Sequence, residues 1–429
     1  MTENDIYGVW LQQALGEGSR RVPQLLEYFG SCKAIYEADE QEIRLSGILG
    51  PKELPRFLAT PLDTAAEIVE ACHRLGYRII IPDDEEYPTR LRNIPDYPAA
   101  LYICGTFPDI DDEACVAMVG TRRASRYGYT TATAIAKDLA ACGVIIISGC
   151  ARGIDTAAHQ GALLSGGKTI AVLGCGINTH YNMENEGLRK VISTSGALIS
   201  EYPPGSPPLS YHFPIRNRLI SALSLGVIVV EAGAKSGSLI TANLALEQGK
   251  DIFSVPGQLN SYLSKGTNRL IFDGAIPIES AADVLDEYVA KFPHRIVSNN
   301  LRDRNSRVYE KHVRPKWDKE ALAEKHGISP EELPKKPSKP EQARNSEKKN
   351  PPADRKRDTE KQSESQPAPP VGMSESAQRV WRLLTAAPKH FHDLLSELGM
   401  DSSELSRCIT ELELYGAVRT LPGNQYSKN

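Results

Sequence analysis

The chain has 429 residues, of which 41% are hydrophobic and 24% charged, and its net charge is −4. This composition is ordinary for a soluble globular protein, and the length predicts two to four domains. It excludes a membrane-spanning protein, because no apolar run approaches the roughly 20 residues of a span. The acidic start, MTENDIYGVW, lacks the basic and apolar regions of a signal peptide, so we expect a cytoplasmic protein without a membrane partner.

The first 70 residues predict a small helical domain. The stretches YGVWLQQAL, RVPQLLEYFG and CKAIYEA place apolar residues three and four positions apart, which is the spacing of one helix face. Gly30 and Gly47 separate these stretches as helix ends or turns. We therefore expect a helical domain over residues 1–70.

Strands and helices alternate in the second predicted domain, residues 71–290. YRIIIPDDEEYP, from residue 77, predicts a strand and a turn, and short apolar runs predict strands at 115–119, 144–147, 169–173, 197–201, 226–232 and 251–256. Continuous apolar runs are typical of strands that are covered on both faces. The repeated strand–helix units predict an α/β fold with a doubly wound parallel sheet, in which ligands bind at the carboxyl ends of the strands.

The stretch 291–370 predicts a basic, Pro-rich and largely disordered linker. It contains 11 of the 29 prolines and 20 Lys and Arg residues against 13 Asp and Glu, a net charge of +7. Too few aliphatic residues remain to form a core. The rest of the chain therefore carries −11, so any nucleic-acid binding by the folded parts requires a local basic patch.

The last predicted domain, residues 371–429, has the pattern of a winged helix. SAQRVWRLLTAA, FHDLLSELG and SSELSRCITELELYG predict three amphipathic helices, and AVRTLPGNQYSKN predicts a hairpin. The third helix carries acidic residues and a single arginine: Asp401, Glu404, Glu411 and Glu413 against Arg407. Such a helix is a poor reader of duplex phosphates, which favours protein contact or a structural role.

The loop after the strand at 115–119, MVGTRRASRYG, predicts an anion site. Gly120 allows the backbone to turn close to a ligand, and Thr121 offers a hydroxyl group. Arg122 and Arg123 supply guanidinium groups suited to phosphate. A solvated basic turn is the alternative.

The next strand ends in SGCARGID, and a helix follows. Ser148, Gly149, Arg152 and Gly153 lie where the strand gives way to the helix N-terminus, so the helix dipole favours an anion there. Strand, tight loop and helix N-terminus together predict a phosphate site.

Two more loops offer hydrogen-bond donors at helix starts. In FPIRNRLIS, Arg216 and Arg218 flank Asn217 at a helix start. Asn217 and Arg218 either reach the strand ends or form salt-bridged helix caps. EAGAKSGSLITA predicts a second phosphate cradle, with a plain Gly-Ser turn as the alternative. Its donor-rich residues are Lys235, Ser236, Gly237 and Ser238.

Catalytic motifs are scarce by comparison. The chain has no GxxxxGK[ST], GxGxxG, GxSxG or HExxH motif, and none of its eight cysteines forms a CxxC pair. Because anion-binding loops are plentiful and catalytic motifs are scarce, the sequence favours a binding protein over an enzyme. We expect no cofactor and no metal. The alternative is a nucleotide-binding hydrolase or phosphotransferase that uses Asp155, His159 or Glu231.

Taken together, the motifs resemble those of the DNA-processing protein A (DprA/Smf) family. From about residue 80 to 288 they run in order as VGTRRAS, SGCARGIDTAAHQGAL, TIAVLGCGIN, LISEYPPG, FPIRNRLISALS, VVEAGAKSGSLITANLALEQG and IFSVPG…SKGTNRLI. The resemblance implies a SAM-like or helix-hairpin-helix-like domain, an extended Rossmann domain and a winged helix.

It also implies a function. Such proteins bind single-stranded DNA without sequence preference, protect incoming DNA, form homodimers through the Rossmann domain and load the RecA recombinase during natural transformation. Transferred to this chain, the loops at 120–122, 148–153 and 235–237 would line the pocket for DNA phosphates, with Tyr127, Tyr181 and Phe213 as candidates for base stacking.

The chain departs from the family pattern in one loop. The family has Tyr-Pro, then a basic residue and Asn, whereas here the sequence reads HYNMENEGL. Asn182 replaces the proline, and Met183 and Glu184 stand where positive charge would help. We expect a weaker groove at this point, with binding carried more by four basic residues, Arg122, Arg123, Arg152 and Lys235.

Overall fold

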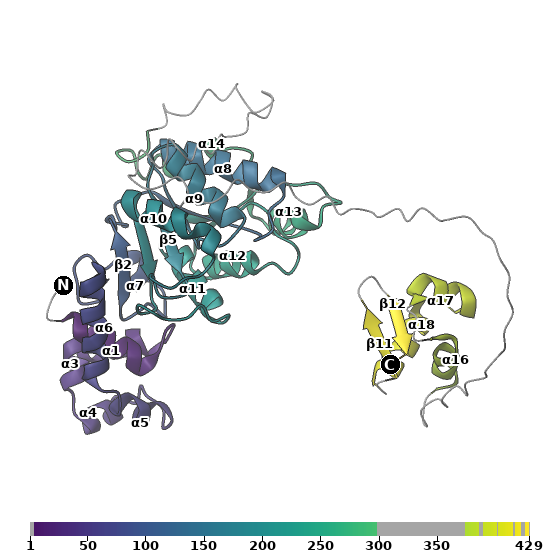
Figure 1. Cartoon of the computed structure of the whole chain (residues 1–429), viewed down its shortest axis with the longest axis horizontal. Coiled ribbons are helices and arrows are strands. Elements are labelled where there is room, and N and C mark those ends of the chain that lie inside the picture. The colour runs from purple at the N-terminus through teal and green to yellow at the C-terminus, as the bar shows by residue number, and fades with distance from the viewer. Residues whose placement is uncertain are drawn as a thin grey trace, which may run out of the picture. The chain divides into compact units, whose positions relative to one another are not determined.

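The computed structural model describes residues 4–297, 374–385, 389–400, 402–414, 417–421 and 425–428. The chain divides into two compact units, residues 1–344 and 345–429, which are described separately below (Figure 1). Most of the predicted linker 291–370 lies outside the described residues, so its disorder stays a prediction. No helix in the described ranges is long and apolar enough to cross a membrane.

The larger unit begins with six short helices, in agreement with the helical pattern of the sequence. They are α1 (Asp5–Leu15), α2 (Arg21–Phe29), α3 (Cys32–Glu37), α4 (Glu40–Leu45), α5 (Glu53–Leu58) and α6 (Leu62–Leu75). Trp10 packs edge-on against Phe57 in their core. A Cβ atom at Gly8 would lie 2.3 Å from Ile81, so this glycine lets α1 lie directly against the sheet domain.

A nine-stranded sheet forms the centre of this unit, in the order β1-β2-β6-β5-β4-β3-β7-β8-β9. Pairing is parallel from β6 to β9, whereas β1 and β2 extend one edge antiparallel. The strands are β1 (Arg78–Ile80), β2 (Leu101–Gly105), β3 (Cys115–Val119), β4 (Ile145–Ser148), β5 (Thr169–Leu173), β6 (Ala197–Ser200), β7 (Gly226–Val229), β8 (Asp251–Ser254) and β9 (Ile276–Pro277). The doubly wound parallel sheet is thus confirmed, while β2 and β9 were not among the predicted strands.

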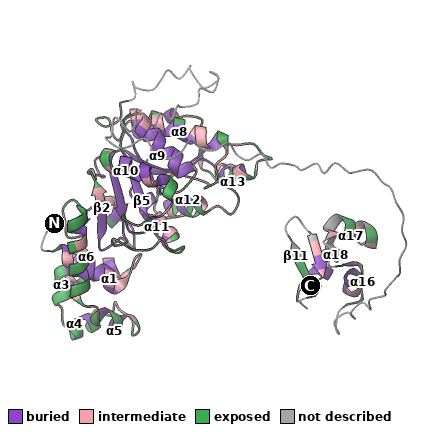
Figure 2. Cartoon of the chain, viewed as in Figure 1, coloured by how far each residue is buried: buried purple, intermediate pink, exposed green. Residues whose placement is uncertain are grey.

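Helices cover both faces of the sheet (Figures 1 and 2). They are α7 (Thr89–Arg92), α8 (Arg126–Ala141), α9 (Ile154–Leu164), α10 (Glu186–Ser195), α11 (His212–Ala222), α12 (Gly237–Glu247), α13 (Lys265–Phe272) and α14 (Ala281–Tyr288), with short 3-10 turns η1 (Met183–Asn185) and η2 (Tyr262–Ser264). Ala117 of β3 packs into one core and Val116 and Met118 into the other. This alternation explains why the strands read as continuous apolar runs.

The strand order reverses at β3. From β3 the chain moves outward through β4, β5 and β6 on one side and then returns to β7 on the other side. In a doubly wound sheet, the crevice at such a reversal is the usual ligand site.

The smaller unit has the helices α16 (Glu375–Leu383), α17 (Phe391–Leu398) and α18 (Ser402–Leu414), with a three-stranded sheet of β10 (Lys389–His390), β12 (Gln425–Lys428) and β11 (Val418–Leu421). This is the predicted winged helix. Glu411 of the acidic helix α18 accepts hydrogen bonds from the backbone and hydroxyl of Ser374, the N-cap of α16. That carboxylate therefore has a structural contact within the domain. Asp401 and the Glu413 side chain lie outside the described residues.

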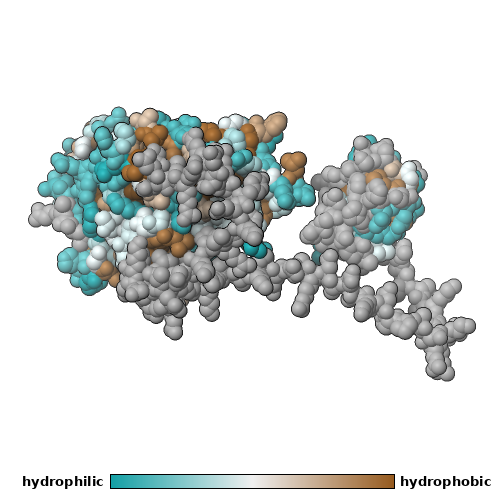
Figure 3. Space-filling model, turned by 90° about the horizontal axis from the view of Figure 1, so that it is seen from above, coloured by the Kyte–Doolittle hydropathy of each residue, from teal (hydrophilic) through white to brown (hydrophobic). Residues whose placement is uncertain are grey.

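The exposed surface mixes polar and apolar residues. On the face seen in Figure 3, hydrophobic areas are separated by hydrophilic ones. Large apolar side chains exposed in the larger unit include Leu246, Leu259, Tyr262 and Phe272, which lie between α12 and the end of α13.

Candidate functional site

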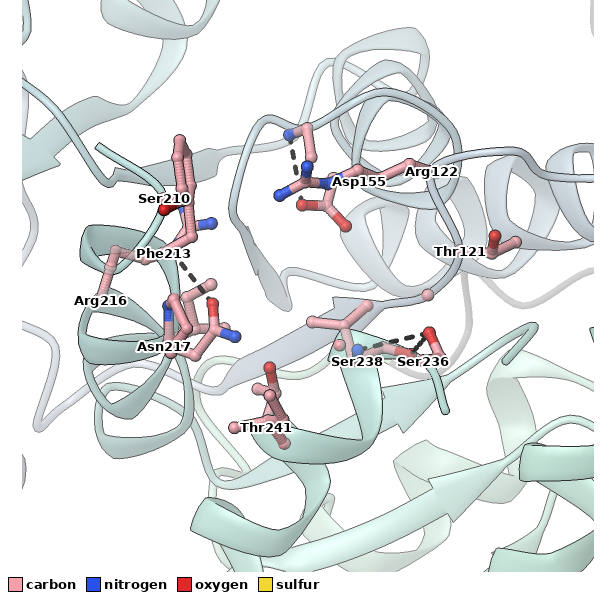
Figure 4. A pocket seen from close by; sticks show the side chains of 17 residues that line it. Thr121, Arg122, Asp155, Ser210, Phe213, Arg216, Asn217, Ser236, Ser238 and Thr241 are labelled. Carbon is pink, nitrogen blue, oxygen red and sulfur yellow. Dashed lines mark hydrogen bonds between the residues drawn. The ribbon is translucent and has the colours of Figure 1, made fainter. Parts of the chain in front are cut away.

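A pocket of about 360 Å³ lies at the carboxyl ends of β3 and β7, where the strand order reverses (Figure 4). Its walls come from the loops after β3 and β4, from α11 and from the start of α12. Half of the predicted site residues line it: Gly120, Thr121, Arg122, Asn217, Ser236, Gly237 and Ser238.

The loop after β3 is tied to the neighbouring loops by its backbone. The Thr121 amide donates to the Glu231 carbonyl at 2.8 Å, and the Ile154 amide donates to the Thr121 carbonyl at 3.3 Å. A Cβ atom at Gly120 would lie 2.5 Å from Ile154. The glycine is thus required by close packing between loops, rather than by the approach of a ligand.

Glu231, two residues after β7, binds the end of the same loop. Its carboxylate accepts hydrogen bonds from the amide (2.9 Å) and the hydroxyl (2.5 Å) of Ser125, the N-cap of α8. Glu231 is buried, and its oxygens face a structural partner. This carboxylate fixes the geometry of the loop that carries Arg122 and Arg123.

Two glycines allow the loop after β4 to pack tightly. Gly153 has φ 80° and caps α9, and a Cβ atom there would lie 2.3 Å from the Thr121 carbonyl oxygen. Gly149 lies against the Arg216 guanidinium, which a Cβ atom would approach to 2.6 Å. Neither position accommodates a side chain without moving its neighbours.

Arg216 is a buried cation at the pocket wall. It donates through Nη1 to the carbonyls of Gly149 (2.9 Å) and Val172, and through Nε to Asn217 at 3.2 Å. Burial lowers its pKa, which the nearby Asp155 carboxylate partly offsets. Burial raises the pKa of Asp155, while Arg216 and the Ala151 amide, 3.2 Å away, oppose that shift. The wall of the pocket thus carries charge of both signs.

Phe213 lies between two arginines. Its ring centre is 5.4 Å from the guanidinium carbon of Arg122 and 5.9 Å from that of Arg216. The Tyr181 ring lies 5.0 Å away on a 39° tilt. Cation–π attraction holds such groups together, and an aromatic ring beside a guanidinium can face both a base and a phosphate.

The start of α12 forms the opposite wall. Ser236 is its N-cap, and its hydroxyl lies 2.9 Å from that of Ser238. Gly237 faces open space, since a Cβ atom there would meet nothing within 4 Å. Lys235 is exposed beside them. Backbone amides at a helix N-terminus favour an anion at this position.

The remaining predicted residues do not line the pocket. Arg123 and Arg152 are exposed near its rim loops, and Ser148 is fully buried with its hydroxyl on the Met118 carbonyl at 2.6 Å. Gly149 and Gly153 allow close packing against Arg216 and Thr121 and do not line the pocket themselves.

Arg218 forms a salt bridge, although between domains and not as the helix cap of the predicted alternative. It is 3% exposed and binds the Glu201 carboxylate through two hydrogen bonds of 2.8 Å each, and it also donates to the Asp96 carbonyl. Glu201 in turn accepts from the Gly18 amide at 3.0 Å. This cluster joins the helical domain to the sheet domain and leaves no guanidinium face for phosphate.

Two of the three candidate catalytic residues are also engaged structurally. His159 is fully buried, and its Nδ1 lies 2.7 Å from the Thr169 hydroxyl. Glu231 binds Ser125 as described above. Only Asp155 reaches the pocket. No group of three or more His, Cys, Asp or Glu residues in the described ranges is arranged to hold a metal.

Comparisons with known proteins identify the family. The model of the family described as "DNA recombination-mediator protein A" matches residues 78–289, and the "DprA winged helix domain" matches residues 363–424. The DNA processing protein DprA of Streptococcus pneumoniae is 44% identical over 205 residues, which are 48% of this chain and 72% of that protein. The chain belongs to the DprA/Smf family.

Other relatives agree with this assignment. Protein Smf of Escherichia coli is 41% identical over 236 residues, which span 55% of this chain but only 63% of that protein. The X-ray structure of the S. pneumoniae DprA matches with a TM-score of 0.59 at 35% identity, covering 67% of this chain and 99% of that one. The resemblance seen in the sequence motifs is therefore confirmed, and with it the family's association with DNA processing and recombination.

Several pocket residues were not among those predicted as site residues. The sequence marks Arg216 and Asp155 without assigning them to the phosphate site, and it gives no signal for Ser210 and Thr241, although all four line the pocket. Ser210 comes from the long loop before α11 and Thr241 from the second turn of α12. Neither carries a local signal, because only the packing of α11 against α12 brings them to the pocket.

Proposed function

We propose that this protein binds single-stranded DNA without sequence preference, as a recombination mediator and not as an enzyme. The observation that carries the proposal is the pocket at the strand reversal. There the N-terminus of α12 and the guanidinium group of Arg122 lie around the Phe213 ring. Arg122, Arg123 and Lys235 are exposed and form no ion pair with any described residue. Exposed cationic side chains without an ion-pair partner are available to bind phosphates.

The exposed aromatic residues favour a single strand over a duplex. Phe213 lines the pocket and is half-buried against the half-buried Tyr181, and Tyr127 and Tyr211 are 51% and 59% exposed. Unpaired bases stack on such rings, whereas bases in a duplex are already stacked on one another. The contacts to phosphates and rings carry no base-specific pattern, which accounts for the proposed lack of sequence preference.

We also propose a homodimer formed through the Rossmann domain, and RecA as the protein partner. The support for the dimer is the group of exposed apolar side chains between Leu246 and Phe272. The support for RecA is family membership alone. The proposed location is the cytoplasm, where both DNA and RecA would be met.

The first test measures fluorescence anisotropy with labelled oligo(dT) and a duplex of equal length over a salt series. Arg122→Ala should weaken oligo(dT) binding by about 1–3 kcal/mol and make the salt slope shallower by roughly 0.7, because one charge-assisted phosphate contact is lost. Arg56→Ala is the matched control, since Arg56 is an exposed arginine in α5, away from the pocket. Equal binding by wild type and Arg122→Ala would count against the site.

The second candidate function is a nucleotide-binding hydrolase or phosphotransferase, favoured by Asp155 in the pocket with its raised pKa. A ligand at 100 times its Kd should stabilise the fold by about 2.7 kcal/mol. A thermal shift with mono- or dinucleotides and none with oligo(dT) would support this candidate over DNA binding.

A further inference from the structure

Arg152 differs from the other exposed basic residues at the strand ends. Arg122, Arg123, Arg126 and Lys235 form no ion pair within the described ranges. Arg152 instead binds the Glu184 carboxylate through Nη2 at 3.0 Å and the Asn182 side-chain oxygen through Nε at 3.2 Å. Two neighbouring oxygens thus occupy adjacent donors of the guanidinium, which is how a phosphate would be bound.

The segment that carries these oxygens is anchored next to Arg152. Asn185 is buried and donates to the Cys150 carbonyl at 3.0 Å and to the Thr156 hydroxyl at 2.8 Å, both in the stretch that contains Arg152. Asn182 adopts a left-handed conformation, with φ 54° and ψ 68°. Asparagine tolerates this conformation better than most residues. The backbone therefore presents Glu184 to Arg152 as part of the folded structure.

From this arrangement we propose that Glu184 is an internal competitor for DNA phosphate at Arg152 and so sets the affinity of the site. The inference rests on the proposed DNA-binding function and deepens it. The two side chains are 61% and 65% exposed, so the pair is weak and a phosphate can displace the carboxylate. Glu184 therefore reduces affinity without closing the site.

Glu184→Gln removes the competing charge and keeps the shape of the side chain. Oligo(dT) should bind about 1.5- to 5-fold more tightly, the range that corresponds to the strength of an exposed ion pair. Glu70→Gln is the matched control, because Glu70 pairs with Arg74 in α6 at the same 3.0 Å, with side chains 69% and 66% exposed. Both variants change the net charge by +1.

A double-mutant cycle separates competition from general repulsion of DNA. In an Arg152→Gln background, the gain from Glu184→Gln should fall to that of Glu70→Gln. An equal gain in both backgrounds, or no gain over Glu70→Gln in the wild-type background, would overturn the proposal. These results are informative when wild type binds oligo(dT) and Arg122→Ala weakens it. If wild type does not bind, the proposed function itself has failed.

Discussion

Replacing Arg218 should destabilise the larger unit far more than it changes DNA affinity. Arg218→Ala would leave Glu201, which is 1% exposed, without the two 2.8 Å hydrogen bonds that now balance its charge. Breaking a buried pair by removing one partner costs about 3–5 kcal/mol. The helical domain contacts the same carboxylate through the Gly18 amide, so the loss should also loosen the junction between the two domains.

Urea denaturation followed by circular dichroism measures this effect, with Arg122→Ala as the surface comparison. Arg122→Ala should stay within about 0.5 kcal/mol of wild type, as exposed substitutions usually do. Arg218→Met combined with Glu201→Leu should recover part of the lost stability, because the double variant removes the Glu201 charge together with its partner. The recovery should be incomplete, because Asp96 loses its ion pair with Arg218 and the Gly18 amide loses its acceptor. A loss below about 1 kcal/mol for Arg218→Ala, or no recovery in the double variant, would refute the assigned structural role.

Three further predictions concern the sheet domain. Gly153→Ala should lower the free energy of unfolding by about 1–3 kcal/mol, because Gly153 has a positive φ and an added Cβ atom would meet backbone atoms. Gly237→Ala is the control and should leave the melting temperature unchanged. Equal melting temperatures for the two variants would contradict the packing role of Gly153. Burial lowers the pKa of His159 from 6.5 to about 3. Between these two pH values the unfolded chain binds a proton that the folded protein does not, so the free energy of unfolding falls as the pH drops from 6.5 toward 3. Unfolding free energy should therefore drop by about 2 kcal/mol between pH 7 and 5, and His159→Gln should remove this part of the slope. Glu231→Gln should weaken oligo(dT) binding several-fold by loosening the Ser125 contact, and unchanged anisotropy would show that the loop does not depend on it.

Much of the sheet could be predicted from the sequence because its strands are buried on both faces. The apolar runs at 115–119 and 169–173 coincide with β3 and β5 to the residue. The missed strands differ from these two in different ways: β2 carries a largely buried apolar run, LYIC, but lies before the alternating strand–helix pattern begins. β9 has only two residues, and β2 pairs antiparallel with β6, almost a hundred positions further along the chain. Local patterns cannot report such long-range pairing.

The site was predicted less completely, and α11 shows why. Arg216 and Arg218 lie two positions apart in the sequence, which places them about 200° apart around a helix. One therefore faces the pocket and the other faces the junction with the helical domain. The sequence shows that both arginines lie near a helix start, but not which way the helix is turned. The packing of α11 against α12 and the sheet decides that orientation.

The net charge of the chain does not predict where DNA would bind, whereas the position of the basic residues at the strand ends does. Residues outside 291–370 carry a net −11, which taken alone would repel DNA. At physiological ionic strength, however, exposed charges more than about 8 Å apart are largely screened from one another. Arg122, Arg123 and Lys235 follow the neighbouring strands β3 and β7, and in the proposed complex they would meet a phosphate at contact distance, where screening is weakest. An acidic protein can thus bind DNA through basic loops at the strand ends, and we expect Glu184, which pairs with Arg152 of one such loop, to influence the affinity more than acidic residues elsewhere do.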